Sequence, residues 1–143
     1  MKPSLLNTIN IGTDIVHIPR ITNLLHRRRN SLVRFTNRIL SDSERADFES
    51  ILASKNVNAN KMFSPDVSRW IAGRFAAKEA ARKASPLGAA SVGWRDVVVH
   101  VPRLHHVEGS VRPEIVYLHA TTVGKLSISH DGEYVVATVL AAT

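Results

Sequence analysis

The pattern of apolar and polar residues predicts a strand, then several helices, and then a group of strands. Residues 8–16 are rich in apolar and β-branched side chains, a composition typical of a strand. Apolar residues then recur at helical spacing in three short segments. One helix starts at Pro19, a second covers residues 31–40, and a third opens with a capping box formed by Ser41 and Glu44.

The longest helix is predicted from Ser64 to about Ala84, after a loop over residues 56–60. Ser64 is followed by a proline and an acid, which is a typical start of a helix. Pro86 and Gly88 end it. Small residues alternate with charged ones along this helix, so other elements can approach it closely.

From Trp94 onward the pattern changes to strands, over residues 94–101, 114–120, 125–130 and 133–141. Asp131 and Gly132 predict a hairpin between the last two strands. One strand, a helical middle and a run of neighbouring strands together indicate an α+β fold. We therefore expect a largely antiparallel sheet with one long helix and several short helices packed on one side.

Length and composition indicate a single domain over residues 1–143. Hydrophobic residues make up 44% and charged residues 22%, as in ordinary globular proteins. The absence of cysteine excludes disulfide scaffolds, thiolate zinc sites and iron–sulfur clusters. No apolar run approaches the roughly 18 to 20 residues of a membrane span, and residues 1–10 lack the features of a signal peptide. These features predict an intracellular protein.

The charge balance predicts an anionic partner, because 19 Lys and Arg against 12 Asp and Glu give a net charge of +7. Arginines are dense near the N-terminus, where they form a basic region suited to phosphate or carboxylate groups. This region contains Arg20, Arg27, Arg28, Arg29, Arg34 and Arg38. An acidic protein or a nucleic acid would fit it, and so would a solvated basic face with no partner.

Capping, turns or solubility do not readily explain two of the acids. Asp14 lies among apolar residues of the first strand, and Glu79 lies among cations on the long helix. Mg²⁺ commonly takes one or two protein carboxylates and fills its other positions with water and phosphate, so this pair could hold it. Alternatively, Asp14 is a hydrogen-bonded buried acid and Glu79 only pairs with Lys83 on a solvated helix.

Cations surround Glu79 on the long helix, and a histidine lies at a strand tip. Arg74, Lys78 and Arg82 form one row of the helix, and Lys83 follows Glu79 by one turn. His130 ends the strand over residues 125–130, where it could donate to a phosphate or simply form a hydrogen bond in the turn.

Four sequence blocks, in order along the chain, resemble the motifs of the holo-acyl-carrier-protein synthases, the small class of 4′-phosphopantetheinyl transferases. The blocks are IGTDIVHIPRI at residues 11–21, FTNRILSDSE at 35–44, WIAGRFAAKEAARKA at 70–84 and KLSISH at 125–130. The sequence departs from the family pattern at His17, where an acid is common, and in the loops over residues 85–88 and 109–113.

The resemblance implies transfer of phosphopantetheine from coenzyme A to a serine of an apo acyl carrier protein, with release of adenosine 3′,5′-bisphosphate. It implies Mg²⁺ on Asp14 and Glu79, with Glu79, Asp14 and Lys83 as the catalytic residues. The residues implied to bind coenzyme A are Arg74, Lys78, Lys83, Ser129 and His130. Those implied to dock the acidic carrier are Arg20, Arg27, Arg28 and Arg34.

The family also implies a homotrimer with active sites at the subunit interfaces, and neither a nucleic acid nor a membrane as partner. An exposed apolar face of a small valine-rich sheet would favour such an assembly. The expected compartment is the cytoplasm or the mitochondrial matrix. Three alternatives remain at this point: a basic nucleic-acid-binding domain, another Mg²⁺-dependent phosphoryl-transfer enzyme, and a structural subunit without activity. Few aromatic residues are available for stacking on bases, which weighs against the first alternative.

Overall fold

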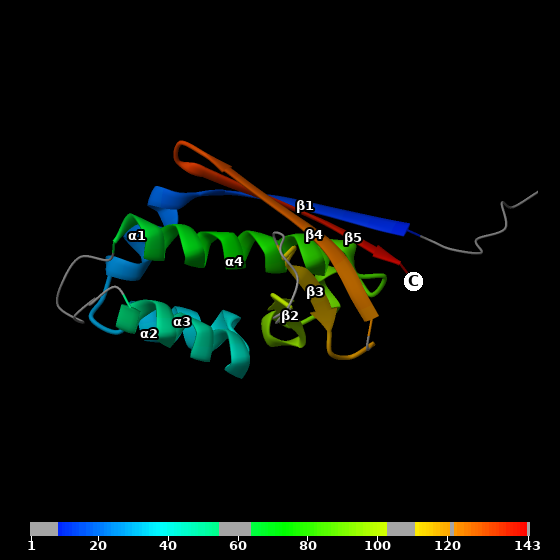
Figure 1. Ribbon diagram of the computed structural model, residues 1–143, viewed down its shortest axis with the longest axis horizontal. Coiled ribbons are helices and arrows are strands. Elements are labelled where there is room, and N and C mark those ends of the chain that lie inside the picture. The colour runs from blue at the N-terminus through cyan, green and yellow to red at the C-terminus, as the bar shows by residue number, and fades with distance from the viewer. Residues whose placement is uncertain (1–8, 55–63, 103–110, 121, 143) are drawn as a thin grey trace, which may run out of the picture.

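A computed structural model describes residues 9–54, 64–102, 111–120 and 122–142, and it shows a sheet with helices on one face (Figure 1). The helices are α1 (Ile18–His26), α2 (Ser31–Ile39), α3 (Asp42–Ser54) and α4 (Pro65–Ala84), with two 3-10 turns, η1 (Ala89–Ser91) and η2 (Trp94–Asp96). The strands are β1 (Ile9–His17), β2 (Val97–His100), β3 (Glu114–Tyr117), β4 (Thr122–Asp131) and β5 (Tyr134–Ala142). They form an antiparallel sheet in the order β1-β5-β4-β3-β2, which confirms the predicted α+β class.

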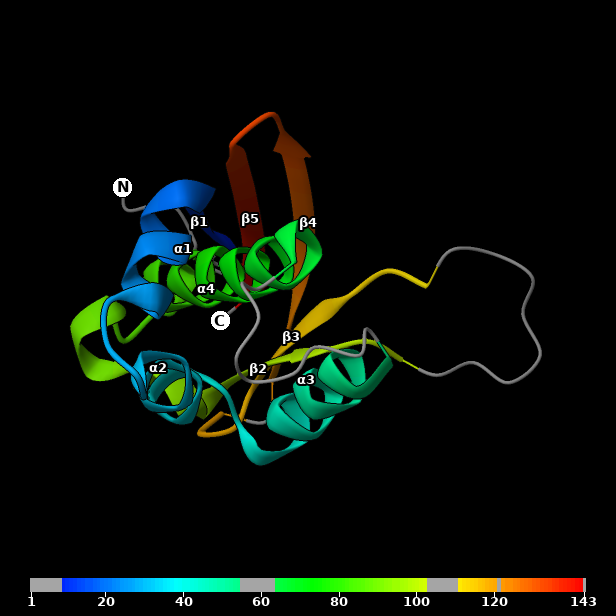
Figure 2. The same ribbon diagram turned by 90° about the vertical axis from the view of Figure 1, so that its left-hand side faces the viewer.

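Helix α4 lies directly on the sheet, and its alanines make this close approach possible (Figure 2). Six of them have no exposed surface, namely Ala72, Ala76, Ala77, Ala80, Ala81 and Ala84. Gly12 of β1 permits the closest approach, since a Cβ atom there would lie 1.9 Å from the carbonyl oxygen of Ala80. This contact places the following residues of β1 beside the last two turns of α4.

The predicted helix starts are confirmed by their hydrogen bonds. The hydroxyl of Ser64 accepts a hydrogen bond from the amide of Val67 at the start of α4. At α3, the amide of Ser41 donates to a carboxylate oxygen of Glu44 over 2.9 Å, and the amide of Glu44 donates back to the Ser41 hydroxyl over 3.4 Å. The Ser41–Glu44 pair is therefore a capping box, as the sequence predicts.

Several details of the C-terminal region differ from the prediction. Strand β3 ends at Tyr117 instead of residue 120, and β4 begins at Thr122 instead of residue 125. Residues 94–96 form a 3-10 turn instead of the start of a strand, and β2 begins at Val97. The hairpin turn is Gly132 and Glu133, one residue later than predicted, because Asp131 still pairs with Tyr134. Gly132 has a φ of +52°, which a glycine adopts at little cost. The predicted loop over residues 56–60 lies outside the described residues.

The face of the sheet opposite the helices (Figure 1) carries several exposed apolar side chains. Side chains alternate along each strand, so one face packs on α4 and the other meets solvent. The large exposed apolar residues on β1, β4 and β5 are Ile9, Ile11, Ile15, Val123, Tyr134 and Leu140. Within the described residues, no helix is long and apolar enough to cross a membrane.

Candidate active site

Asp14, Glu79, Arg82 and Lys83 form a cluster where β1 crosses the end of α4, and we call these four residues the acid–base cluster. The ammonium of Lys83 donates to Asp14 Oδ1 over 3.0 Å and to the carbonyl oxygen of Thr13 over 2.9 Å. Arg82 Nη1 donates to Glu79 Oε1 over 2.5 Å. Asp14 is 17% exposed and Glu79 21%, so both carboxylates are largely shielded and each has a cationic partner.

The fold explains how two acids that are 65 residues apart come to the same end of α4. Asp14 lies two positions after Gly12 on the same face of β1, so it points toward the helix. Glu79 lies one helical turn before Lys83, on the same side of α4. Lys83 therefore reaches from the helix to Asp14, and Glu79 lies one helical turn earlier on the same side of α4.

The acid–base cluster contains two carboxylates that could ligate a hard divalent cation. Each carboxylate uses one oxygen for its cationic partner, and the other oxygen accepts no hydrogen bond from the described residues. No group of three or more acids, histidines or cysteines that could hold a metal ion occurs in the described part of the chain. Two carboxylates suffice for Mg²⁺ when water and phosphate complete its coordination.

The structure contradicts the predicted role of Lys78 in binding phosphate. Its side chain is fully buried, and the ammonium lies 2.6 Å from a carboxylate oxygen of Glu44. It also donates to the carbonyl oxygens of Trp94 and Val97 over 3.0 and 2.7 Å. Burial lowers the pKa of Lys78, while the nearby Glu44 carboxylate opposes that shift. Lys78 therefore joins α4 to α3 and β2 and cannot reach a substrate.

Arg74 packs at the interface of α3 and α4. Its guanidinium lies 4.5 Å from the centre of the Trp70 ring. Burial lowers the pKa of Arg74, and the charges of Glu44 and Asp47 act in the opposite direction. Its predicted contact with coenzyme A stays a prediction.

Ser129 and His130 lie near the tip of the β4–β5 hairpin, level with Ile15 and Val16 of β1. Strand β5 separates β4 from β1, and the hairpin tip lies toward the start of α4 (Figure 1). Among the described residues, no hydrogen bond or ion pair joins Ser129 or His130 to Asp14, Glu79 or Lys83. Their predicted contact with coenzyme A stays a prediction.

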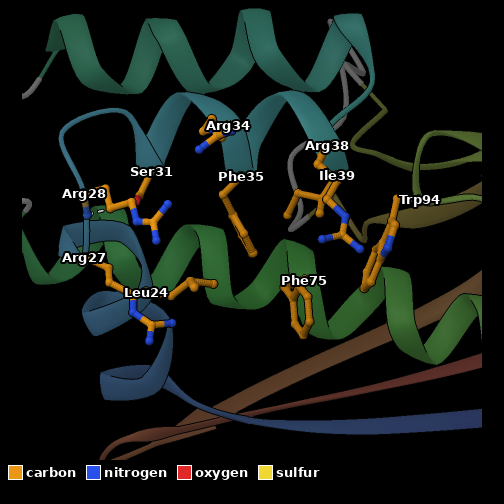
Figure 3. Close-up of a pocket in the computed structure, with 10 residues that line it drawn as sticks. All are labelled: Leu24, Arg27, Arg28, Ser31, Arg34, Phe35, Arg38, Ile39, Phe75 and Trp94. Atoms are coloured by element: carbon orange, nitrogen blue, oxygen red, sulfur yellow. Dashed lines mark hydrogen bonds between the residues drawn. The ribbon is translucent and has the colours of Figure 1, made fainter.

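The arginines predicted to dock a partner gather around a groove between α1, α2 and α4 (Figure 3). The groove has a volume of about 510 Å³. Its lining residues, which define the arginine groove, are Leu24, Arg27, Arg28, Ser31, Arg34, Phe35, Arg38, Ile39, Phe75 and Trp94. Arg20 lines an adjoining hollow that shares Leu24, Arg27, Phe35 and Phe75. The surface combines exposed positive charge with an apolar floor.

The aromatic floor of the arginine groove adjoins the acid–base cluster. Phe75 stacks between Phe35 and Trp94, with ring centres 5.8 and 4.9 Å apart. Phe75 is also one helical turn before Glu79 on α4. The sequence showed the row of Phe75, Glu79 and Lys83, but not that aromatic residues from α2 and η2 complete this floor.

Comparison with known proteins identifies the class to which this fold and cluster belong. The sequence model described as the 4′-phosphopantetheinyl transferase superfamily matches residues 10–139, and the chain belongs to that superfamily. Similar proteins are named holo-[acyl-carrier-protein] synthase, and the chain is a transferase of this type.

Two relatives and one solved structure illustrate the similarity. The 4′-phosphopantetheinyl transferase B, mitochondrial, of Aspergillus fumigatus is 52% identical over 148 residues, covering 94% of each chain. The holo-[acyl-carrier-protein] synthase of Gloeobacter violaceus is 39% identical and covers 90% of this chain and 89% of its own. A holo-(acyl-carrier-protein) synthase from Bacillus anthracis, solved with CoA (3′,5′-ADP), has a TM-score of 0.64 and 29% identity. The match covers 94% of this chain and 96% of that one.

Proposed function

We propose that this protein transfers 4′-phosphopantetheine from coenzyme A to a serine of an apo acyl carrier protein, with Mg²⁺, and releases adenosine 3′,5′-bisphosphate. Family membership, the names of its relatives and a coenzyme A-bound structural neighbour support this assignment. The observation that carries it is the position of Glu79. Glu79 is one helical turn before Lys83, which pairs with Asp14, and one helical turn after Phe75 on the floor of the arginine groove.

In this reaction the serine oxygen forms a bond to the phosphorus that carries pantetheine, and the bond from that phosphorus to the leaving bisphosphate breaks. Glu79 takes the serine proton, directly or through a water molecule. Lys83 donates to the phosphates of coenzyme A and offsets their charge. Asp14 and Glu79 would hold Mg²⁺, whose charge would make the phosphorus more electrophilic and stabilise the leaving group.

Mass spectrometry of intact carrier protein tests the assignment. An apo acyl carrier protein is incubated with this protein, coenzyme A and Mg²⁺, and a parallel sample contains EDTA. We expect the mass of one phosphopantetheine arm to be added in the first sample and not in the second. A folded enzyme that modifies none of several carriers would overturn the proposal.

The arginine groove is proposed to dock the acidic carrier, because exposed guanidinium groups surround an apolar floor (Figure 3). Arg34→Glu is expected to raise the KM for the carrier about tenfold, equivalent to about 1.4 kcal/mol. The KM for coenzyme A should change little, and added salt should weaken carrier binding by the wild type more than by the variant. Initial rates at varied carrier concentration measure this effect.

Arg112→Glu is the matched control, since Arg112 is exposed and lies outside the groove. It makes the same charge change and should leave the KM for the carrier near the wild-type value. Equal effects of the two substitutions would show that net charge alone, and not this groove, attracts the carrier.

A homotrimer is proposed on the basis of the outer sheet face and the position of His130. Ile11 is 67% exposed and Ile15 is 60% exposed on β1, and association with other copies of the chain would bury them. The same association would bring the β4–β5 hairpin of one chain to the acid–base cluster of another. Active sites would then form between subunits, with Ser129 and His130 contributed by the neighbour.

Ile11→Asp is therefore expected to dissociate the assembly and to abolish most of the transfer activity. Light scattering after size-exclusion chromatography gives the mass of the wild type and the variant. Val33→Asp is the control, because Val33 is 57% exposed on α2, outside the sheet. A wild-type mass of one chain would contradict the trimer.

The mitochondrial relative favours the mitochondrial matrix over the cytoplasm as the proposed compartment. Family membership favours the transferase over a nucleic-acid-binding domain or a structural subunit. Another Mg²⁺-dependent phosphoryl transfer would use the same acids, and the appearance of a modified serine distinguishes the two reactions.

A further inference from the structure

The side chain of Arg82 is held from several directions, although arginine side chains on helices are usually free to move. Its Nε donates to the carbonyl oxygen of Val92 over 2.7 Å, and its Nη2 donates to that of Ala89 over 2.7 Å. The guanidinium carbon lies 4.6 Å from the centre of the Trp94 ring. Nη1 donates to Glu79, so each nitrogen of the guanidinium has an acceptor, and only 18% of the side chain is exposed.

A second ion pair on α4 shows that the hydrogen bonding of Arg82 is unusual. Arg69 and Asp66 have the same three-residue spacing, but their charged atoms are 3.6 Å apart and the side chains are 43% and 55% exposed. Such surface pairs contribute little and move freely. In contrast, the loop after α4 and the ring of Trp94 hold the partner of Glu79 from outside the helix.

We propose that Arg82 is a positioning residue for Glu79, an inference that rests on the proposed role of Glu79 in the transfer. The guanidinium holds Oε1, and this limits the rotation of the carboxylate. The second oxygen, Oε2, is left without a hydrogen bond from the described residues and is available to the reaction. Because a misplacement of about 1 Å can cost about 10²-fold in rate, such support has a large kinetic effect.

The residues that hold Arg82 also contact the floor of the arginine groove. Trp94, which packs against Arg82, also stacks on Phe75 of the groove floor at 4.9 Å (Figure 3). The position of Glu79 is therefore linked through Arg82 and Trp94 to the surface proposed to receive the carrier.

Arg82→Lys tests the proposal, because it keeps the charge but cannot make three hydrogen bonds in a planar fork. We expect kcat to fall about 10- to 100-fold, with the KM for coenzyme A within about threefold of the wild-type value. We also expect the affinity for Mn²⁺, measured by electron paramagnetic resonance without coenzyme A, to fall at least threefold. Wild-type kcat and Mn²⁺ affinity in Arg82→Lys would overturn the proposal.

A double-mutant cycle shows whether Arg82 acts through Glu79. The transfer rates of Arg82→Gln, Glu79→Gln and the double variant are compared, with melting temperatures to confirm folding. Arg82→Gln should add little to the loss already caused by Glu79→Gln. Fully additive losses would overturn the proposal. So would Arg82→Gln having no more effect than the matched surface variant Arg69→Gln.

Different outcomes would contradict the positioning role of Arg82 and the proposed role of Glu79 in the transfer. If Glu79→Gln transfers phosphopantetheine at the wild-type rate, the role of Glu79 is wrong, and the positioning role of Arg82 falls with it. If Glu79→Gln is inactive and Arg82→Lys is fully active, only the role of Arg82 is wrong.

Discussion

Glu79→Gln is expected to lower kcat for phosphopantetheine transfer roughly 10²- to 10⁴-fold. The amide cannot accept a proton from the serine, and it is a poorer ligand for Mg²⁺ than the carboxylate. The fold should persist, because the amide oxygen can still accept the hydrogen bond from Arg82 and the side chain keeps its size. The melting temperature should therefore change little.

Initial rates of carrier modification, followed by mass spectrometry, measure this effect at saturating coenzyme A and several Mg²⁺ concentrations. Glu49→Gln is the matched control, because Glu49 is an exposed acid on α3, away from the acid–base cluster. It should transfer at the wild-type rate. Turnover within threefold of wild type in Glu79→Gln would remove Glu79 from the mechanism.

Much of the fold follows from local sequence patterns. The starts of α3 and α4 were predicted from Ser41, Glu44 and Ser64, because capping depends on residues only three positions apart. The order β1-β5-β4-β3-β2 was not predictable in this way, since pairing of β1 with β5 joins residues more than a hundred positions apart. The 3-10 turn at residues 94–96 also reflects tertiary contacts, because the carbonyl oxygen of Trp94 accepts a hydrogen bond from buried Lys78.

The acid–base cluster was predictable only in part. Asp14 was conspicuous as an acid in an apolar strand, and Glu79 and Lys83 share a helix face. Their motifs were also similar to those of a known family. The support from Arg82 was not predictable, because its acceptors on residues 89 and 92 are backbone carbonyls whose positions depend on the loop.

The arginine groove could also be predicted only in part from the sequence. The basic residues of α1 and α2 are visible in the sequence as a cluster of charge, which is consistent with many partners. The floor that Phe35, Phe75 and Trp94 build comes from three separate elements. Helical periodicity marks each aromatic residue as apolar but does not show that the three stack together.

Lys78 illustrates why spacing alone misassigns a charged residue. It is next to Glu79 in the sequence and was grouped with the phosphate-binding cations. Adjacent residues on a helix point about 100° apart, so Lys78 turns toward α3 and β2 while Glu79 turns away. Its partner Glu44 was recognised as a helix cap, but the same carboxylate also accepts a hydrogen bond from the amide of Val99 over 3.0 Å. Glu44 and Lys78 thus connect α3, α4 and β2 inside the protein.

Removing one member of this buried ion pair is expected to destabilise the protein by about 3–5 kcal/mol. Lys78→Met leaves the Glu44 carboxylate buried without its counterion, and it leaves the carbonyl oxygens of Trp94 and Val97 without their donor. Glu44→Gln removes the opposite charge and leaves the Lys78 ammonium unpaired. Urea unfolding curves for each variant, at constant pH, give the loss in the free energy of unfolding.

The double variant Glu44→Gln/Lys78→Met separates the charge pairing from the packing. With both charges absent, no unpaired ion is buried, so the double variant should be less destabilised than the sum of the two single variants. Arg69→Gln, which breaks an exposed pair on the same helix, should stay within about 0.5 kcal/mol of the wild type. A stable Lys78→Met variant with a raised KM for coenzyme A would instead indicate that Lys78 binds the substrate. A buried structural lysine predicts a loss of stability and little change in this KM.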